Sequence, residues 1–318
     1  MASSQDADPG GGRLNHLALV GPTGSGKSAV AFELARQLSE EGPRVELVSV
    51  DSMQVYRGMD IGTAKPSTEE RAEVPHHLID LVDPAEDFTV TRYLAAARPV
   101  LEGIEARGHR ALLVGGTGLY FQAVVDQLTP PGQYPRLRAE LEVERDGAVL
   151  YRQLEQLDPA AASKIEPGNR RRVVRALEVT VGSGRPFSSF GTGIDSYPAT
   201  RFRLAGLWLP RAVVAGRIAT RLAAMVSAGL LDEVRRLAAR PGGLSRTARQ
   251  ALAYRELLAC LEGVTSLDEA LAEAISRTRS FARRQRMWWR RDPRITWYGT
   301  RENPLAVIPA LLGDWRSP

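Results

Sequence analysis

A glycine-rich string near the start of the chain is the feature best suited to chemistry. GPTGSGKS fits the P-loop pattern G-x-x-x-x-G-K-S/T in full; in this pattern glycines let backbone N–H groups surround phosphate oxygens, the lysine adds a cation and the serine a Mg²⁺ ligand. An apolar run at residues 17–20 precedes the string and helically spaced apolar residues follow it, so we expect a strand, the loop and a helix in that order. The pattern predicts that a di- or triphosphate binds at Gly21, Pro22, Thr23, Gly24, Ser25, Gly26, Lys27 and Ser28.

Two further apolar runs end in residues suited to the same site. Residues 45–50 lead into Asp51, and a carboxylate at the carboxyl edge of a strand faces the same crevice as a P-loop. Asp51 could be a metal-linked acid or a general base, and an N-cap or turn aspartate is the structural alternative. Residues 111–114 lead into GGTG, with Thr117, where P-loop proteins that hydrolyse nucleotides carry an acid. The pattern therefore favours close approach to a ligand over metal ligation at that strand.

The elements that would position these residues alternate between strands and helices. Strands are predicted at residues 17–20, 45–50, 111–114 and 203–209, and helices at 88–107, 138–157, 169–181 and 211–239, the last with a break at Gly229. A capping box at Ser266 predicts the start of the last long helix. Because strands that alternate with helices form parallel sheets, the predicted fold class is α/β, with a P-loop NTPase-like parallel sheet flanked by helices and an all-helical insertion domain.

The predicted domains follow from where the strand pattern stops and resumes. Only helical periods occur between about residues 129 and 197, and turn residues bound this stretch. We therefore predict a disordered tail at residues 1–13, a first part of the P-loop core at 14–128, the helical insertion at 129–197, and a second part of the core with a basic C-terminal helix at 198–318.

Composition excludes several classes of protein. Hydrophobic residues make up 43% of the chain and charged residues 25%, which is typical of a soluble globular protein. No apolar run approaches the ~20 residues of a membrane span, the first residues lack a secretory-signal pattern, and a single cysteine excludes a disulfide framework. We expect a cytoplasmic protein without a membrane partner, in which Cys260 is a small buried side chain.

Arginine supplies most of the positive charge. The net charge is +5, and only three of the 42 basic residues are lysines. Residues 277–294 contain eight arginines and one acid, which suggests a polyanionic partner, although a solvated helix face has the same composition. Trp288 and Trp289 are interpreted as core side chains in preference to base-stacking ones. A single basic stripe is predicted for Arg279, Arg283, Arg286 and Arg290.

Together these strings resemble those of the tRNA dimethylallyltransferases, also called tRNA isopentenyltransferases. The matching strings are GPTGSGKS, DSMQVYRGMDIGTAKP, HHLID, VGGTGLYFQAVV, RALEVTVGSGRP and TRSFARRQRMWWRRDPRI, in this order from about residue 17 to 297. DSMQ-x-Y followed by DIGTAKP is specific to this family among P-loop proteins. The chain is similar to the bacterial form, because this sequence lacks the C-terminal zinc finger of eukaryotic members.

The resemblance implies prenyl transfer to tRNA. In the family, N6 of the adenosine 3′-adjacent to the anticodon attacks C1 of dimethylallyl diphosphate, and pyrophosphate leaves. By resemblance Asp51 is the general base, Thr117 and Arg217 contact the diphosphate, and the P-loop binds it with Mg²⁺ held near Ser28 and Asp51. The expected partners are dimethylallyl diphosphate and the anticodon stem-loop of tRNA, and the expected oligomeric state is a monomer.

The resemblance also assigns contacts with tRNA. The DSMQ segment matches the one that meets the flipped adenosine, and RRVVR in the insertion matches a family segment that begins with glutamine where this chain has Arg171. QALAYR matches a segment with glycine where this chain has Ala253, so the local backbone is expected to differ. The expected tRNA-binding residues are Asp51, Ser52, Met53, Gln54, Arg138, Arg171, Arg172, Val173, Val174, Arg175, Gln250, Ala251, Leu252, Ala253, Tyr254, Arg255, Arg279 and Arg283.

The residues leave three other functions open. A prenyltransferase acting on free AMP or ATP shares the motifs but needs neither the arginine stripe nor a basic insertion. A P-loop small-molecule kinase needs ATP and an arginine-rich lid, and the absence of an acid after residues 111–114 argues against it. A nucleotide-dependent RNA-binding switch would form no prenyl product. His76 and His77 lack partners at metal-ligand spacing and are interpreted as structural residues or donors to RNA.

Overall fold

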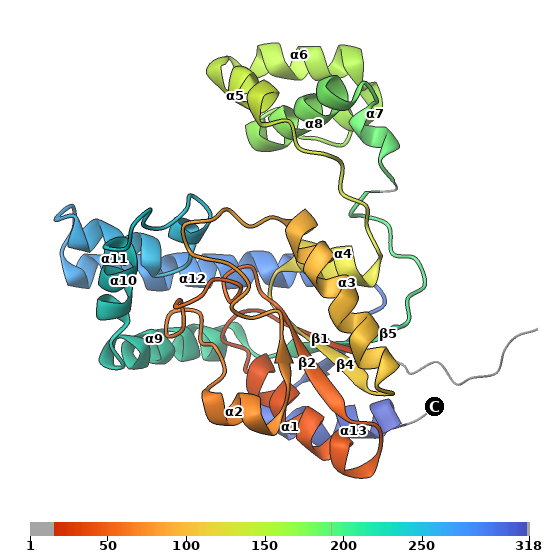
Figure 1. Ribbon diagram of the computed structural model, residues 1–318, viewed down its shortest axis with the longest axis vertical. Helices are drawn as coiled ribbons and strands as arrows, with labels where there is room; N and C mark the ends of the chain where they lie inside the picture. Colours follow the sequence, from red (N-terminus) through yellow and green to blue (C-terminus); the bar gives the residue numbers. More distant parts are fainter. Residues whose placement is uncertain (1–15, 192, 317–318) are drawn as a thin grey trace, which may run out of the picture. The chain divides into compact units, whose positions relative to one another are not determined.

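The computed structural model describes residues 16–191 and 193–316 (Figure 1). The tail predicted at residues 1–13 lies outside this part of the chain. Two compact units are present: one combines the chain up to Phe121 with the chain from Thr200 onward, and the other comprises Gln122–Ala199. The second unit thus begins seven residues before the predicted insertion, within a helix, and ends two residues after it.

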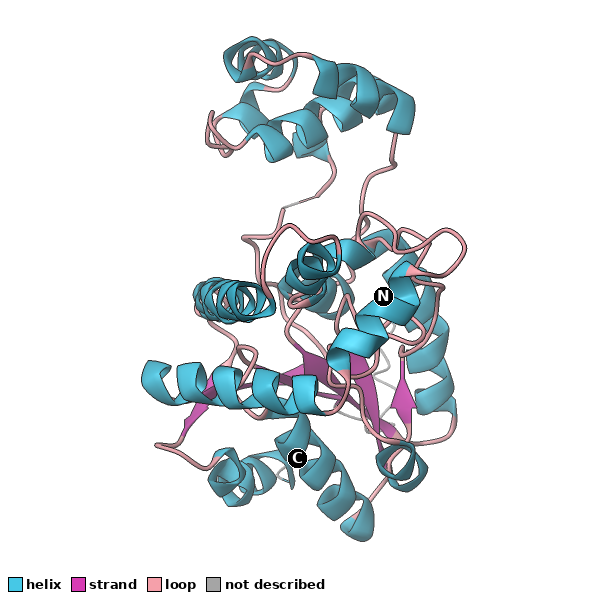
Figure 2. Ribbon diagram, turned by 90° about the vertical axis from the view of Figure 1, so that its left-hand side faces the viewer, coloured by secondary structure: helices cyan, strands magenta, loops and turns pink. Residues whose placement is uncertain are grey.

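The first unit is built on a six-stranded sheet in which every neighbouring pair of strands is parallel. Its strand order is β3-β2-β4-β1-β5-β6, and helices lie on both faces of the sheet (Figure 2). The predicted α/β class is therefore confirmed. The strands are β1 (His16–Val20), β2 (Val45–Val50), β3 (His76–His77), β4 (Arg110–Gly115), β5 (Phe202–Trp208) and β6 (Thr296–Gly299).

Four of these strands were predicted, and the two outer ones were not. β3 has two residues and β6 has four, so neither is long enough to produce a clear apolar pattern. The central strands are in register, with Val20 of β1 and Val50 of β2 both opposite Gly115 of β4. The loops that follow β1, β2 and β4 therefore begin at one level, at the carboxyl edge of the sheet.

The helices of the first unit agree with the main helical predictions. The long helix expected after residue 210 is interrupted at Gly229, whose φ of 96° is left-handed, and Ser266 forms the predicted capping box. They are α1 (Lys27–Glu41), α2 (Thr68–Glu73), α3 (Val90–Ala106), α4 (Gly118–Val125, which crosses the unit boundary), α9 (Arg211–Ser227), α10 (Leu230–Ala238), α11 (Tyr254–Leu261), α12 (Leu267–Trp289) and α13 (Ile308–Arg316), with short 3₁₀ turns at Ala248–Gln250 and Pro304–Val307.

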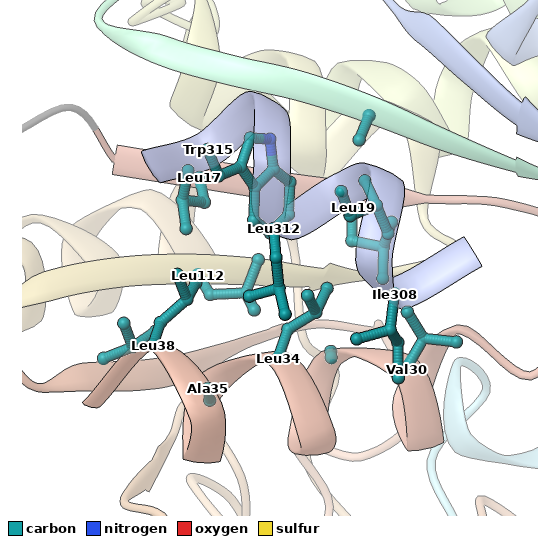
Figure 3. Close-up of a cluster of buried hydrophobic side chains, with 14 of the residues drawn as sticks. Leu17, Leu19, Val30, Leu34, Ala35, Leu38, Leu112, Ile308, Leu312 and Trp315 are labelled. Atoms are coloured by element: carbon teal, nitrogen blue, oxygen red, sulfur yellow. The ribbon is translucent and has the colours of Figure 1, made fainter. Parts of the chain in front are cut away.

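One hydrophobic cluster fixes the P-loop helix to the sheet. Leu34 of α1, Leu112 of β4 and Leu312 of α13 belong to it, together with Trp315 (Figure 3). Leu34 and Leu112 are completely buried, and burying a leucine side chain fully stabilises a fold by about 1.5–3 kcal/mol. The start of α1, where a phosphate would bind, is thereby anchored to the strands that carry the rest of the site.

The second unit is helical, as predicted, but its first helix is divided. The single helix expected at residues 138–157 is wrong: α5 (Pro135–Val143) ends before Asp146, which caps a new helix by accepting a hydrogen bond from the N–H of Ala148. A short polar side chain that bonds to the backbone two residues on favours a helix start over a helix interior. The remaining elements are α6 (Gly147–Leu157), α7 (Pro159–Ala162), α8 (Arg170–Ser183) and a 3₁₀ turn at Phe187–Ser189.

Helix length and apolar character bear on whether a segment could cross a membrane. No single helix among the described residues is long and apolar enough to span a bilayer. The pair α9 and α10, bent by 65° at its break, meets the length and composition requirements only when taken together.

Candidate active site

A cavity of about 410 Å³ opens at the carboxyl edge of the sheet in the first unit. The P-loop contributes Thr23, Lys27 and Ser28 to its wall, and the loop after β2 contributes Asp51. Thr117 and the two glycines before it come from the loop after β4, and further walls come from residues 62–66, α9, residues 250–253 and α12. The structure therefore brings together the P-loop, the acid and the threonine that the sequence singled out.

The P-loop has the backbone shape that phosphate binding requires. Gly24 and Gly26 have φ values of 80° and 86°, and a side chain at Gly26 would come within 2.5 Å of Pro304 Cγ. Gly26 directly precedes α1, and no side chain caps that helix start. The first amides of α1 are thus available to an anion, at the positive end of the helix dipole.

Lys27 is a half-buried cation next to this helix start. Burial lowers the pKa of its ammonium to about 8, although the negative charge of Asp51 opposes the shift. A buried ammonium is stabilised by an anionic ligand at close range. The lowered pKa therefore agrees with a site in which a phosphorylated ligand would stabilise the charged form of Lys27.

Gln285 of α12 joins two walls of the cavity, and sequence reasoning missed it. Its Oε1 accepts a hydrogen bond of 2.8 Å from the N–H of Thr23, and its Nε2 donates one of 2.8 Å to the carbonyl of Gly116. The side chain is buried, so the amide holds the P-loop at a fixed distance from the loop after β4. A glutamine among eight nearby arginines gives no motif that would have revealed this contact.

Asp51 and Thr117 are oriented by backbone hydrogen bonds. Asp51 Oδ1 accepts from the N–H of Met53 at 2.8 Å and of Gln54 at 3.4 Å. Thr117 Oγ1 accepts from the N–H of Ser52 at 3.0 Å. A side chain at Gly115 would lie 2.0 Å from the carbonyl of Val50, so the close approach of these loops depends on that glycine. Both polar groups are therefore held in fixed positions at the cavity wall.

The segment after Asp51 is fastened by internal contacts. Gln54 donates from Nε2 to the carbonyls of Thr63 and Ala64 at 3.1 and 3.2 Å and accepts from Ser49 Oγ at 2.7 Å. The Lys65 side chain is buried and donates to the carbonyl of Tyr56 and to the carboxylates of Asp60 and Asp80. The DSMQ and DIGTAKP strings therefore form one folded wall of the cavity.

Glu233 supports that wall from α10. Its carboxylate is buried and accepts hydrogen bonds from the N–H groups of Asp60, Ile61 and Gly62 at 2.8–3.2 Å. Tyr254 Oη also donates to it at 2.5 Å. Three backbone amides and a phenol satisfy the charge without a basic side chain, which agrees with the rule that buried charges must be hydrogen-bonded.

Two neighbouring arginines of α9 occupy different places. Arg221 lines the cavity and donates to Thr23 Oγ1 at 2.7 Å. Arg217, expected to contact the diphosphate, donates from Nε to the carbonyl of Gly24 at 2.9 Å and is not among the residues that line the cavity. In this structure Arg221 presents its guanidinium to the cavity, and Arg217 supports the outside of the P-loop.

In the QALAYR segment most side chains are buried or half-buried, and one residue has an unusual backbone conformation. Ala253 has a φ of 69°, a left-handed conformation that explains why glycine suits this position. Ala251 and Ala253 line the cavity although little of either is exposed. Tyr254 is completely buried, so its expected contact with tRNA is replaced by the hydrogen bond to Glu233. Gln250 and Arg255 are exposed and Leu252 is half-buried.

In the second unit, four of the six residues expected to face RNA have structural contacts within that unit instead. Val173 and Val174 lie in the hydrophobic cluster of that unit, so the expectation that they contact tRNA is corrected. Arg138 and Arg175 both pair with Glu178, at 3.3 and 2.8 Å. Only Arg171 and Arg172 of this segment are exposed, because one face of α8 packs against the core and the opposite face is in contact with solvent.

The predicted stripe on α12 is interrupted. Arg279, Arg283 and Arg290 are exposed, but Arg286 is buried, donates to the carbonyl of Leu209 and stacks on Trp208 with its guanidinium 3.5 Å from the ring centre. Trp289 is buried against Phe121, which confirms the core interpretation for that residue.

The histidines and the cysteine complete the predicted residues. His77 Nε2 contacts Glu46 Oε2 at 2.6 Å, and His76 Nδ1 contacts the carbonyl of Val74 at 2.7 Å, so both have structural contacts. The described residues contain no group of three or more His, Cys, Asp or Glu side chains arranged to hold a metal. Cys260 is half-buried, which corrects the expectation of a fully buried side chain.

The parallel sheet, the P-loop and the cavity at its carboxyl edge define an α/β protein with the geometry of a phosphate-binding site. A model of the IPP transferase family matches residues 54–292, and the chain belongs to this family, whose members are prenyltransferases.

Similar proteins and structures support this assignment. The chain is 45% identical over 312 residues to the tRNA dimethylallyltransferase of Moorella thermoacetica, with 94% of each chain covered. It is 47% identical to that of Kineococcus radiotolerans, with 88% of this chain and 89% of the other covered. The solved tRNA isopentenylpyrophosphate transferase of Bacillus halodurans superposes with a TM-score of 0.68 at 36% identity, covering 96% and 97%. A solved eukaryotic dimethylallyltransferase acting on tRNA superposes with a TM-score of 0.76 at 25% identity, and the match covers 95% of this chain and 80% of the other.

Proposed function

We propose that this protein transfers the dimethylallyl group of dimethylallyl diphosphate to N6 of the adenosine 3′-adjacent to the anticodon of tRNA. The N6–C1 bond forms, the bond between C1 and the bridging oxygen breaks, and pyrophosphate leaves. The observation that carries the proposal is that the P-loop and Asp51 line one cavity, while β4 ends in glycine where a hydrolytic acid would stand. Relatives named tRNA dimethylallyltransferase at 45–47% identity support it.

The P-loop wall suits the diphosphate. The amides at the start of α1, the Lys27 ammonium and the Arg221 guanidinium supply positive charge. Negative charge grows on the bridging oxygen as C1 departs, and fixed donors that meet this charge lower the barrier. Thr117 Oγ1 accepts from the N–H of Ser52 at 3.0 Å and donates to Ser52 Oγ over a long 3.4 Å; rotation of this hydroxyl away from Ser52 would let it donate to the same group.

Asp51 suits the role of general base. Both backbone hydrogen bonds to its carboxylate use Oδ1, which leaves Oδ2 to accept the proton from N6. A positioned carboxylate of this kind typically contributes about 10²- to 10⁴-fold to a rate. The fastening of the DSMQ segment through Gln54 and Lys65 holds that oxygen in place during the reaction.

The donor set also suits Mg²⁺. Ser28 offers a hydroxyl and Asp51 a carboxylate, both hard oxygen donors that line the same cavity. Mg²⁺ prefers few protein ligands together with waters and phosphate oxygens. Mg²⁺ bound there would neutralise charge on the diphosphate.

The tRNA is expected to contact exposed arginines. Arg171 and Arg172 in the second unit and Arg279 and Arg283 on α12 are exposed, and arginine contacts with phosphates give affinity that falls with salt. We further propose that the protein acts as a cytoplasmic monomer.

A transfer assay tests the proposed function. Purified protein and Mg²⁺ are incubated with dimethylallyl diphosphate labelled in the prenyl group, bulk tRNA, and AMP and ATP as competing acceptors. Label in tRNA alone is the expected result. Label on AMP or ATP alone would assign the protein to free nucleotides, and ATP consumption without any prenyl product would favour a kinase.

A further inference from the structure

A second, smaller pocket lies between α9 and α12 in the first unit. Its volume is about 210 Å³. Pro22 of the P-loop forms one wall, and Val214, Ala215 and Ile218 of α9 form another. Four arginines complete it: Arg211, Arg279, Arg283 and Arg286.

This pocket is distinct from the cavity at the carboxyl edge of the sheet. Ile218 is the single residue that lines both. Thr23 lines the larger cavity and Pro22 the smaller pocket, so the P-loop separates them. A group bound in the smaller pocket would therefore lie behind the P-loop and would not occupy the position of the diphosphate.

The charge in the pocket is unbalanced. Among the described residues that line it there is no carboxylate. Arg286 is 7% exposed, and its buried Nε has no hydrogen-bond partner among the described residues, although its terminal nitrogen donates to Leu209. Burial and the nearby charges of Arg211 and Arg290 lower the pKa of this guanidinium.

The remaining arginines are held only weakly. Arg279 reaches the carbonyl of Ala215 at 3.5 Å, and Arg283 donates to Ser280 Oγ at 2.8 Å. Neither contact neutralises a charge. Fixed positive charge in a concave site, with a buried donor left over, is the arrangement that binds a phosphate oxygen.

We propose that this pocket binds one phosphate group, separate from the prenyl-donor site, through Arg279 and Arg283 at its rim and Arg286 at its base. Its volume suits a single phosphate with a few waters. The phosphate belongs either to the backbone of bound tRNA or to a small phosphorylated molecule. The RNA source rests on the proposed function, and the small-molecule source does not.

Ethylation interference tests the RNA source. End-labelled tRNA is prepared with on average one ethylated, and so uncharged, phosphate per molecule. Molecules bound to wild-type protein are separated from unbound ones, and the phosphates whose ethylation prevents binding are mapped. The same experiment uses an Arg279→Gln/Arg283→Gln variant, with Arg290→Gln as a control for the loss of a nearby exposed charge on α12. The slope of log affinity against log salt should become shallower by about one for each phosphate that the variant no longer binds.

Inorganic phosphate tests the other source. Calorimetric titration is performed on Lys27→Met protein, in which the P-loop site is weakened, with and without the two arginine substitutions. Unfolding curves confirm that each variant is folded. Prenyl transfer is assayed on protein that keeps Lys27, with and without the two arginine substitutions, so that failure of the proposed function is recognised separately.

Two results would support the pocket and two would overturn it. Loss of one discrete interference position in the double variant, with that position retained in Arg290→Gln, identifies a tRNA phosphate. A small ligand is identified if the interference pattern is unchanged and the double substitution weakens the binding of inorganic phosphate at least about tenfold. Equal effects of Arg290→Gln and the double substitution would show general attraction only, and no change in either experiment would exclude the site.

Discussion

At the amino-terminal edge of the sheet, charged side chains are paired with one another. Glu46 of β2 is 3% exposed and accepts hydrogen bonds from Arg107, His77 and His109. Burial opposes its ionisation, but these bonds outweigh burial and lower its pKa to about 2. At this edge, charge is neutralised within the protein and contributes to stability.

At the carboxyl edge, charge remains available. Lys27 is half-buried, and desolvation lowers its pKa to about 8. Only one carboxylate oxygen of Asp51 accepts hydrogen bonds from its own loop. The same sheet therefore has one edge where Glu46 and its partners neutralise each other, and one where Lys27 and Asp51 keep groups that can bind a ligand. Substitutions at the first edge should change stability alone, whereas substitutions at the second should change activity or, in two cases, improve stability.

The largest effect is expected from Lys27→Met. Loss of this cation should lower kcat/KM for dimethylallyl diphosphate by at least about 30-fold, because leaving the opposite charge unpaired costs about 2–5 kcal/mol. It should also raise the free energy of unfolding of the ligand-free protein at pH 7, by up to about 3 kcal/mol, since burial disfavours the ammonium. Steady-state kinetics and urea unfolding measure the two quantities. Lys164→Met is the control and should change neither; a Lys27→Met variant within threefold of wild type would contradict the comparison.

At the opposite edge, Glu46→Gln should reduce the free energy of unfolding by about 2 kcal/mol at pH 7, less than the full pKa shift implies because water screens the half-exposed Arg107. Glu46 has a lowered pKa, so its contribution is present above about pH 4.5 and is lost as the pH falls toward 2. The difference between wild type and variant should therefore shrink in acid. Urea unfolding at pH 7 and pH 3 checks this, with Glu41→Gln as an exposed control. Reduced prenyl transfer by the folded Glu46→Gln variant would contradict the expectation that substitutions at this edge change stability alone.

Activity and stability should respond differently to high pH, because both depend on the charge of Lys27. Lys27 carries its charge below about pH 8, so kcat/KM for the diphosphate should fall up to tenfold per pH unit above that value. Stability should not fall in the same range, because the unfolded chain binds the proton more tightly than the folded one and unfolding becomes less favourable as pH rises toward 10. A pH profile with Lys27→Arg as control tests this, since arginine keeps its charge. A wild-type profile that stays level to pH 9.5 would be inconsistent with a lowered pKa.

The smallest effect is expected at Ala253, beside the cavity. Its φ of 69° is strained for any residue with a side chain, so Ala253→Gly should raise the free energy of unfolding by about 0.5–1 kcal/mol. Ala259→Gly, within the regular helix α11, should instead lower it by about 1 kcal/mol. Thermal unfolding of the two variants gives the comparison, and equal destabilisation by both would argue against strain at residue 253.

Much of the carboxyl edge could be predicted from the sequence because its residues follow strands with strong apolar patterns. Residues 45–50 were assigned to a strand with the bounds found for β2, and the P-loop, Asp51 and Thr117 meet as expected. Each signal is local: a strand, then a turn with a characteristic residue.

Contacts between distant segments could not be predicted in this way. Gln285 bonds to Thr23 across 262 positions, and Glu233 caps a loop more than 170 positions away. Arg286 was assigned to an exposed stripe because helical spacing gives the relative directions of side chains but not which direction faces the core. The buried Val173 and Val174 were misassigned to RNA binding because a family segment was carried over as a block, although neighbouring positions on a helix point in different directions.

The most direct test of Asp51 as the base is single-turnover prenyl transfer to tRNA by Asp51→Asn. Asparagine can still accept the hydrogen bond from Met53, so the loop should keep its shape, and tRNA affinity should stay within about threefold of wild type. The rate of the chemical step should fall by about 10²- to 10⁴-fold, the usual contribution of a general base. A rate within tenfold of wild type, or a loss of tRNA binding as large as the loss of rate, would contradict the assignment.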